Sequence, residues 1–269
     1  MTPVTAIVIT RNEAANIEAA LTSLAFASEI IVVDSESTDD TVALARRFTD
    51  RVIVRPWPGY IAQKNFAAAQ ASHDWVFSLD ADERVSAPLA DEIHAWANGN
   101  APGYAEVTGF RIPRVTFHLG RWLRSTDWYP DYQLRLYDRR RARWSGRHVH
   151  ESVRADGPVA RMRGELLHYA YRDLSHHLVT MDRYTTLAAR QMFEDGRRAG
   201  WWDLALHPPA AFVRNYLLRG GFRDGVPGLI VSAMNARYVG IKLAKLWELC
   251  SASTSTRPAP GAVDSSRRS

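Results

Sequence analysis

The sequence predicts an α/β protein in which a mostly parallel sheet is covered by helices on both faces and is followed by a helical C-terminal extension. In the first third of the chain, short β-branched runs alternate with helical patterns, which is typical of βαβ units. These runs are apolar throughout rather than alternating, which indicates strands that are buried on both faces. Helical patterns dominate from Leu174 onward and predict the extension.

The elements of the first third follow one another in a regular order. Strands are expected at Val4–Thr10, Ile30–Val33, Arg51–Arg55 and Trp75–Leu79. Helices are expected between them, at Ala14–Ala25, from Ser37 or Thr38 to about Phe48, and at Ile61–Ala71. Ser37 and Thr38 are both suitable N-caps, because a hydroxyl oxygen can accept from the free N–H groups of a first helical turn.

The rest of the chain changes character several times. Short strand-like segments rich in Arg and Trp extend from about Gly99 to Leu167 and predict an antiparallel addition to the sheet. A helix is expected at Leu174–Phe193, and an apolar tract follows at Trp201–Leu249. Breaks in this tract are expected at Pro208, Pro209, Gly220, Gly221, Pro227 and Gly228. Ser251–Ser269 is rich in Ser, Thr, Pro and Arg and is expected to be disordered, so the chain divides into residues 1–95, 96–170, 171–250 and 251–269.

Composition favours a cytoplasmic protein with an anionic partner. The single cysteine, Cys250, cannot form an internal disulfide and fits a reducing compartment. The chain has no uncharged apolar run of about 18 residues, and Met1–Thr10 has the pattern of a strand, so we expect neither a membrane span nor an export signal. The net charge of +5 suits nucleic acid, phosphorylated lipid or a nucleotide.

Polar clusters follow three of the predicted strands. They are TRNE at Thr10–Glu13, DSES at Asp34–Ser37 and DADE at Asp80–Glu83. In open parallel sheets, ligands bind outside the carboxyl ends of the strands. The three clusters are therefore expected to meet in one crevice.

Asp80 and Asp82 have the pattern of a metal site. A turn after the strand can place both carboxylates on one side, where they repel each other unless a divalent cation is shared between them. Hard oxygen ligands favour Mg²⁺ or Mn²⁺, and Mg²⁺ is usually held by one or two carboxylates together with substrate phosphates. The alternative is a solvated, charged helix start.

Asp34 and Glu13 each have two interpretations. Asp34 directly follows a strand and can accept hydrogen bonds from a nucleoside ring or ribose, or it can cap the next helix. Glu13 at the end of the first strand has the same ambiguity. Neither G-x-G-x-x-G nor G-x-x-x-x-G-K-[ST] is present, so any phosphates are expected to be held by a metal and basic side chains.

Three segments together carry a resemblance to a known family: AIVITRNEAANIEAALTSL, IIVVDSESTDDT and GYIAQKNFAAAQASHDWVFSLDADE. In order and spacing, over roughly Thr2 to Ser86, they resemble the nucleotide-sugar-binding half of family 2 glycosyltransferases, which have the GT-A fold with a Rossmann-like sheet. Within that family the chain resembles bacterial lipopolysaccharide core glycosyltransferases of the β-glucosyltransferase type, and WYPDYQLRLYDRR and GRHVHESV extend this similarity. Residues 1–95 would then bind the nucleotide sugar and residues 96–170 the acceptor.

The resemblance implies roles for individual residues. Thr10, Arg11, Glu13 and Asp34 would line the pocket for the base and ribose of a nucleotide-sugar donor, which we expect to be a UDP-sugar, and Lys64 would lie near the same nucleotide. Asp80 would contact the ribose or a metal-bound water, and Asp82 would hold Mg²⁺ or Mn²⁺ on the diphosphate.

The catalytic base has two candidates. The family usually has an acidic pair followed by Leu and Arg, and the Asp of the pair is the base. PDYQLRL places Asp131 in that position with Pro130 replacing the preceding acid, and Glu151 of HVHE is the rival. The implied reaction is a metal-assisted single displacement at the anomeric carbon, which inverts its configuration. His148 and His150 would face the same way on an extended segment, where either could complete the metal shell, touch the diphosphate or be a hydrogen-bonded structural histidine.

The acceptor and location are suggested by two further patterns. An arginine-rich region lies at Arg139, Arg140, Arg141, Arg143, Arg147, Arg154, Arg161 and Arg163; it lacks a nucleic-acid-binding motif, so we expect an anionic glycolipid acceptor rather than nucleic acid. A helical wheel puts Leu229, Ala233, Ala236, Leu243 and Trp247 on one side and Arg237, Lys242 and Lys245 on another. Such a helix can lie in a membrane interface, or it can pack on the domain or on a second subunit. The resemblance favours peripheral attachment to the inner face of the cytoplasmic membrane.

Two other classes of function remain open from the sequence. A sugar nucleotidyltransferase also uses a metal, carboxylates and a parallel sheet, but it needs a triphosphate site. A non-catalytic relative would bind a sugar nucleotide or lipid without forming a product.

Overall fold

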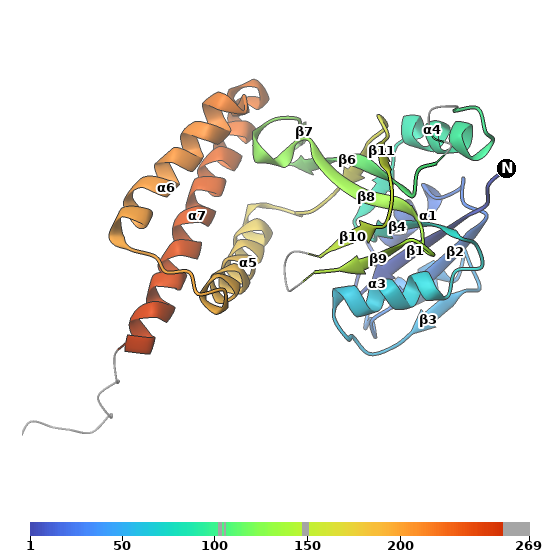
Figure 1. Cartoon of the computed structure of the whole chain (residues 1–269), viewed down its shortest axis with the longest axis horizontal. Helices are drawn as coiled ribbons and strands as arrows, with labels where there is room; N and C mark the ends of the chain where they lie inside the picture. The colour runs from blue at the N-terminus through green and yellow to red at the C-terminus, as the bar shows by residue number, and fades with distance from the viewer. Residues whose placement is uncertain (102–103, 105, 147–150, 255–269) are drawn as a thin grey trace, which may run out of the picture.

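The computed structural model describes residues 1–101, 104, 106–146 and 151–254. A sheet with its covering helices forms one side of the molecule, and the C-terminal helices form the other (Figure 1). The helices of the C-terminal part of the chain thus lie beside the sheet and do not cover its faces.

The parallel half of the sheet has the strand order β3 (Val52–Val54), β2 (Glu29–Asp34), β1 (Val4–Thr10) and β4 (Trp75–Asp80). The connecting helices are α1 (Ile17–Thr22), α2 (Thr41–Ala45) and α3 (Tyr60–Ala69). The predicted strands and their parallel direction are confirmed. Helices α1 and α2 are shorter than predicted, because the turns before them are held by side chains: the backbone N–H of Glu13 donates to Thr41 Oγ1 at 2.8 Å.

The second half of the sheet is mainly the antiparallel addition that the sequence predicts, although two of its short strands pair in parallel with a longer one. Strand β8 (Asp131–Asp138) runs antiparallel to β4, and β6 (Gly109–His118) runs antiparallel to β8. The sheet is completed by β12 (Leu166–His168), β5 (Glu83–Val85), β7 (Arg121–Leu123) and β11 (Val159–Arg161). Strands β9 (Ala142–Ser145) and β10 (Ser152–Ala155) pair separately, and α4 (Ala87–Ala97) follows β5.

The two faces of the sheet carry separate hydrophobic cores. Val4, Ala6 and Val8 of β1 pack on one face with residues of α1 and α4. Ile7 and Ile9 pack on the other face with residues of α3, β9 and β10. The continuous apolar pattern of β1 thus results from burial on both sides, as predicted.

The helical extension consists of α5 (Leu174–Glu194), α6 (Trp201–Val213) and α7 (Gly225–Thr254), with the short turns η3 (Arg214–Leu218) and η4 (Gly221–Asp224) between the last two helices. Helix α7 continues to Thr254, so the predicted start of a disordered tail at Ser251 is wrong. The physical reason is that Leu249 and Cys250 still pack against the core between α5 and α7. Residues 255–269 lie outside the described residues, and no helix within the described part of the chain has the length and hydropathy to cross a membrane.

Several residues at which the sequence predicts a break in this apolar tract lie inside helices instead. Pro208 and Pro209 both lie inside α6. A Cβ on Gly240 of α7 would lie 3.4 Å from Cγ of Pro208, which is an ordinary van der Waals contact. A Cβ on Gly228 would lie 1.9 Å from the carbonyl oxygen of Gly221. Gly228 therefore allows a close backbone contact and does not end the helix.

Candidate active site

A cavity of about 750 Å³ opens at the carboxyl ends of β1 and β4. Strand register brings the polar strand ends level, with Thr10 opposite Asp34 and Ile9 opposite Asp80. Strands β2 and β3 lie on one side of β1 in the sheet, and the next strand along the chain, β4, pairs with the other side of β1. Such a switch point is where open α/β sheets bind ligands.

A continuous series of ion pairs runs beside this cavity, from Glu151 through Lys64, Asp80, Arg135, Glu83 and Arg114 to Asp131. Lys64 Nζ lies 3.0 Å from Asp80 Oδ1 and 3.4 Å from Glu151 Oε1. Burial raises the pKa of Asp80, but the charges of Arg135 and Lys64 outweigh it and hold this pKa well below its usual range. Asp80 is therefore an anion that two cations already neutralise.

Arg135 is the buried centre of the series. It lies between Leu134 and Leu136 in β8, and its Nη2 is 2.7 Å from both Asp80 Oδ2 and Glu83 Oε1. Burial alone would lower the pKa of Arg135, yet the two carboxylates raise it above its ordinary value. The guanidinium thus remains charged and fixes the turn after β4 to the antiparallel half of the sheet.

Asp131 and Glu151, the two candidate bases, have different surroundings. Asp131 Oδ2 accepts from Arg114 at 2.6 Å (Nη2) and 2.9 Å (Nε), Oδ1 accepts from Gln133, and the residue does not line the cavity. Glu151 lines the cavity. Burial raises its pKa, and this effect exceeds the opposing effect of Lys64. A carboxyl with a raised pKa is the better matched to proton transfer near neutral pH.

Asp82 and His168 meet at the cavity from distant parts of the chain, with Asp82 Oδ2 at 3.3 Å from His168 Nε2. Burial raises the pKa of Asp82, but its hydrogen bond with His168 and the charge of that ring bring it below its usual value. A carboxylate and an imidazole are suitable ligands for Mn²⁺, and the carboxylate suits Mg²⁺. Within the described residues, no group of three or more His, Cys, Asp or Glu could hold a metal. Asp82 and His168 are therefore two candidate metal ligands at the cavity.

Buried polar atoms without a partner also face this region. Within the described residues, Thr10 Oγ1, Glu151 Oε2 and the Nε and Nη1 atoms of Arg135 are buried and make no hydrogen bond. All three residues line the cavity. Buried polar groups are normally satisfied, so these atoms indicate a place for a polar ligand.

The structure brings most of the sequence-predicted site residues together. Thr10, Arg11, Glu13, Lys64, Asp80, Asp82 and Glu151 all line the cavity. Asp34 does not line it: the residue is fully buried, and its carboxylate accepts from the backbone N–H of Ser37 at 2.8 Å and from the Ser37 hydroxyl. His148 and His150 lie outside the described residues.

An aromatic pair at the cavity was missed by the sequence reasoning. Trp57 and Tyr60 line the cavity, and their rings meet edge to face with centroids 4.7 Å apart. Both side chains are more than a third exposed. The segment RPWPGY between β3 and α3 carries the signal, because a Trp between two prolines in a loop is unsuited to a core position.

Helix α5 closes one side of the same cavity. Arg183 and Tyr184 of α5 line it, and Arg183 Nη2 donates to the hydroxyl of Tyr60 at 3.3 Å. Burial raises the pKa of Tyr184, and Glu151 and Asp82 are among the charges that add to this effect. The helical extension is therefore part of the site.

Comparisons with known proteins agree with this geometry. Residues 5–154, more than half of the chain, match the family described as Glycosyl transferase family 2. The lipopolysaccharide core biosynthesis glycosyltransferase LpsC of Rhizobium meliloti (strain 1021) is 32% identical over 253 residues, which cover 91% of this chain and 92% of LpsC. An uncharacterized glycosyltransferase of Rickettsia typhi is 31% identical over 93% of this chain and 88% of its own.

A solved structure shows the same fold. The mannosyltransferase PcManGT of Pyrobaculum calidifontis, in complex with GDP-Man and Mn²⁺, superimposes with a TM-score of 0.54 and 18% identity over 92% of this chain and 88% of its own. The GT-A fold expected from the resemblance is thereby confirmed. Of the function classes that the sequence leaves open, sugar transfer is the one these similarities support. The chain belongs to glycosyl transferase family 2 and is a nucleotide-sugar glycosyltransferase with the GT-A fold.

Proposed function

We propose that the protein is an inverting hexosyltransferase that moves a sugar from a UDP-sugar to a lipid-linked saccharide such as the inner core of lipopolysaccharide. The observation that carries the proposal is the cavity at the β1–β4 switch point, which joins a metal-type pair, Asp82 and His168, to the buried carboxyl of Glu151. The similarity to LpsC along nearly the whole chain supports this acceptor class.

Nucleotide binding is assigned to the cavity wall from β1 to α3. The exposed faces of Trp57 and Tyr60 offer a stacking surface for a base, and Thr10, Arg11 and Glu13 offer polar groups for the base and ribose. Thr10 Oγ1 is buried and unpartnered within the described residues, so it is suited to a ligand hydrogen bond. Lys64 and the neutralised Asp80 lie at the ribose end of this wall.

Asp82 and His168 would hold the metal. When bound, Mg²⁺ or Mn²⁺ would neutralise charge on the departing diphosphate. The carboxylate of Asp82 supplies the hard oxygen ligand, and His168 orients it from β12. Asp80 has a different part in this proposal, since Lys64 and Arg135 occupy both of its oxygens.

Glu151 is the proposed general base. Its carboxylate takes the proton of the acceptor hydroxyl, the acceptor oxygen bonds to the anomeric carbon, and the bond from that carbon to the diphosphate breaks with its electron pair. One displacement inverts the anomeric configuration. Lys64, at 3.4 Å, holds the Glu151 carboxylate in position, and the raised pKa of Glu151 makes proton uptake favourable.

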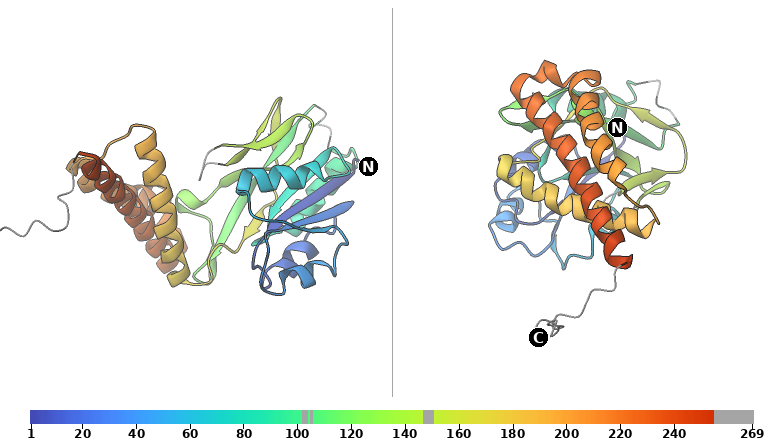
Figure 2. Two further views of the ribbon diagram at one scale, coloured as in Figure 1. Left: turned by 90° about the horizontal axis from the view of Figure 1, so that it is seen from below. Right: turned by 90° about the vertical axis from the view of Figure 1, so that its left-hand side faces the viewer.

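Peripheral contact with a membrane is supported by the outer face of the helical extension. Helices α6 and α7 lie side by side and are foremost when this end of the molecule is viewed (Figure 2, right), with α5 behind them. Exposed apolar side chains follow one stripe of α6, at Trp202, Leu206 and Val213, and continue at Phe222 and Val226. Trp202, Leu206 and Val226 are each about 60% exposed or more, whereas a core-facing stripe would be buried.

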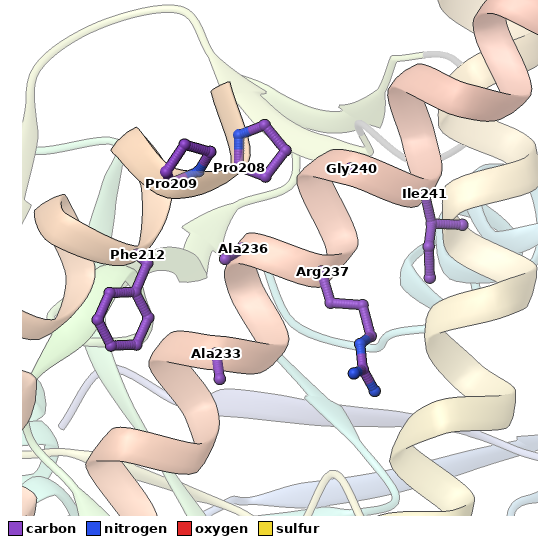
Figure 3. A pocket seen from close by; sticks show the side chains of 8 residues that line it. All are labelled: Pro208, Pro209, Phe212, Ala233, Ala236, Arg237, Gly240 and Ile241. Atoms are coloured by element: carbon purple, nitrogen blue, oxygen red, sulfur yellow. The ribbon is translucent and has the colours of Figure 1, made fainter. Parts of the chain in front are cut away.

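The cations around this stripe suit an anionic lipid surface. A shallow apolar groove between α6 and α7 is formed by Phe212, Ala233 and their neighbours, and Arg237 of α7 is among its lining residues, with its guanidinium pointing away from Phe212 (Figure 3). Arg223 and Arg237 are exposed on the same part of the extension. Lys245, in contrast, donates to Asp182, Thr185 and Thr186 of α5 and is not free for lipid. We therefore assign the N-terminal half of α7 to an anionic membrane, and the proposed lipid-linked acceptor supports the inner face of the cytoplasmic membrane as the location.

The test combines donor binding with transfer. Calorimetric titration of a panel of UDP- and GDP-sugars, each with and without Mn²⁺, should show metal-assisted binding of one UDP-sugar, and deacylated truncated lipopolysaccharide core should then accept that sugar with inverted configuration by NMR. Asp82→Asn and His168→Asn should each weaken metal-assisted donor binding by about tenfold or more. His94→Asn, an exposed histidine on α4, is the matched control and should bind donor normally. Metal-independent binding, or a product of retained configuration, would contradict the proposal.

A further inference from the structure

A second cavity, of about 260 Å³, adjoins the donor cavity on the side of the helical extension. Tyr171 and Tyr184 line both cavities, so a ligand in the second would lie next to a sugar bound in the first. The remaining wall comes from η2 (Thr126–Trp128), α5 and α7, through Trp128, Thr180 and Tyr238 among others. Among the residues that the structure describes, none from β1, β2 or β4 lines this second cavity.

Stacked rings form a rigid wall in this cavity. Tyr171 stacks on His177 with ring centroids 4.2 Å apart, and Trp128 lies 5.7 Å from Tyr171. Trp128 Nε1 donates to Asn235 Oδ1 at 3.1 Å, which fixes the indole orientation. Aromatic faces held in this way bind the C–H face of a sugar ring at little cost in conformational entropy.

The cavity is electrically neutral. None of the side chains that line it is Lys, Arg, Asp or Glu, and burial lowers the pKa of His177 to about 4, with smaller effects from His118 and His176. His177 is therefore uncharged at pH 7. A phosphate or carboxylate would lose its hydration here and would meet no cation among the lining side chains; Lys242, whose Nζ lies 5.4 Å from the ring centroid of Tyr238, is not one of them.

Hydroxyl groups in the wall remain free for a ligand. Within the described residues, the phenol oxygens of Tyr171, Tyr184 and Tyr238 make no hydrogen bond that competes with a ligand. Burial raises the pKa of Tyr171 to about 12 and also raises the pKa of Tyr238, so both phenols keep their protons and can donate. Apolar faces combined with neutral donors and acceptors match the chemistry of an uncharged sugar.

We propose that this second cavity is a subsite for an uncharged sugar ring of the acceptor saccharide, next to the residue that receives the transferred sugar. The inference rests on the proposed function and deepens it, because it assigns acceptor recognition partly to α5 and α7. Anionic groups of the acceptor bind outside this subsite, and Arg183, which lines the donor cavity next to Tyr184, is a cation suited to them.

The experiment fills the subsite and measures acceptor and donor kinetics separately. Thr180→Phe projects a ring into the cavity, whereas Val179→Phe adds the same ring one residue away, at a side chain that is 70% exposed and outside the cavity. With deacylated truncated lipopolysaccharide core as acceptor, Thr180→Phe should raise the acceptor KM at least tenfold. Its donor KM and its rate of donor hydrolysis without acceptor should stay within twofold of wild type. Val179→Phe should match wild type in all of these values.

A conservative variant guards against a folding artefact. Tyr238→Phe removes one hydroxyl and should raise the acceptor KM about fivefold with an unchanged melting temperature. Equal acceptor KM values for wild type, Thr180→Phe and Tyr238→Phe would overturn the subsite while leaving sugar transfer intact. A wild-type protein that neither binds nor hydrolyses a UDP-sugar would instead overturn the proposed function, and the subsite with it.

Discussion

The Nζ atom of Lys64 lies 3.4 Å from Oε1 of Glu151, so α3 of the donor-binding half holds the start of β10 at the cavity. Lys64 is almost fully buried and also pairs with Asp80 at 3.0 Å. The Lys64 ammonium thus pairs with Asp80, whose pKa is lowered, and with Glu151, whose pKa is raised. Two carboxyl groups with pKa values moved apart are suited to different roles in one reaction.

Removing the proposed base should affect turnover far more than donor binding. We expect Glu151→Gln to lower kcat about 10² to 10⁴-fold, the usual range for general-base help, with little change in the donor Kd. Asp131→Asn should lower kcat less than tenfold and should lower the melting temperature, because Arg114 loses its forked partner. Steady-state kinetics and calorimetry on both variants provide the measurement. If Asp131→Asn lost more kcat than Glu151→Gln at unchanged stability, Asp131 and not Glu151 would be the general base.

Membrane association should depend on the outer stripe of α6. We expect Leu206→Glu and Val213→Glu to reduce partitioning onto vesicles of phosphatidylethanolamine and phosphatidylglycerol at least tenfold, because each places a charge where apolar surface would enter the interface. Flotation of vesicles with bound protein measures this directly. Val54→Glu is the control, since Val54 is 48% exposed at β3 on the sheet side of the molecule. Binding that survives both α6 variants would argue for a protein partner on this face.

Glu29 should make the free energy of unfolding depend on pH in the acidic range. Its carboxylate accepts from Thr5 Oγ1 at 2.7 Å and from the Ser72 N–H at 2.8 Å, and Arg51 pairs with it. Burial raises the pKa of Glu29, but these hydrogen bonds outweigh it and lower the pKa to about 2, from an ordinary value of 4.5. The stabilisation is therefore complete above about pH 4.5 and is lost as the pH falls through about 2.

The corresponding measurement compares wild type with Glu29→Gln in urea at several pH values. We expect the variant to unfold with about 1 to 2 kcal/mol less free energy at pH 7, which is the order of hydrogen bonds to a charged group. The two proteins should converge as the pH approaches 2. A difference that is constant from pH 7 to pH 2.5 would show that the charge of Glu29 is not the cause.

Gly228 should tolerate no side chain. A Cβ there would lie 1.9 Å from the Gly221 carbonyl oxygen and 2.9 Å from Cβ of Asp224, so η4 would have to move away from α7. We expect Gly228→Ala to destabilise the helical extension by more than the gain of about 1 kcal/mol that Ala normally brings to a helix interior. Gly196→Ala is the comparison, because a Cβ at Gly196 meets no atom within 4 Å although its φ of 77° makes it strained. Thermal melts that rank Gly228→Ala as the milder change would contradict this packing.

The crevice could be predicted from the sequence because its parts lie at the ends of strands with a clear pattern. Continuous apolar runs fixed the positions of β1, β2 and β4, and parallel pairing then brought Thr10 and Asp34 level. The role of the polar residues at each strand end was harder to predict. A D-x-x-S sequence fits a ribose contact and a turn equally well, and in the structure Asp34 binds the backbone and hydroxyl of Ser37.

Other site residues depend on long-range pairing that no local pattern reveals. His168 reaches Asp82 because the short strand β12 pairs with β5, which puts His168 opposite Glu83. Arg183 and Tyr184 belong to a helix whose periodicity gives no sign that it faces a cavity. Arg135 did carry a signal, since an arginine between two leucines in a buried strand requires nearby carboxylates.

The hydrogen bond from Arg183 of α5 to Tyr60 of α3 has a consequence for protein engineering. Because α3 and α5, which lie more than 100 residues apart in the sequence, share one cavity wall, a chimera that joins residues 1–170 of this enzyme to the helices of a relative exchanges part of the cavity as well as the outer helices. Grafts that bring in α5 of a relative should therefore carry the α3 of that relative as well. Grafts that exchange only α6 and α7 should keep the sugar-nucleotide preference of the parent.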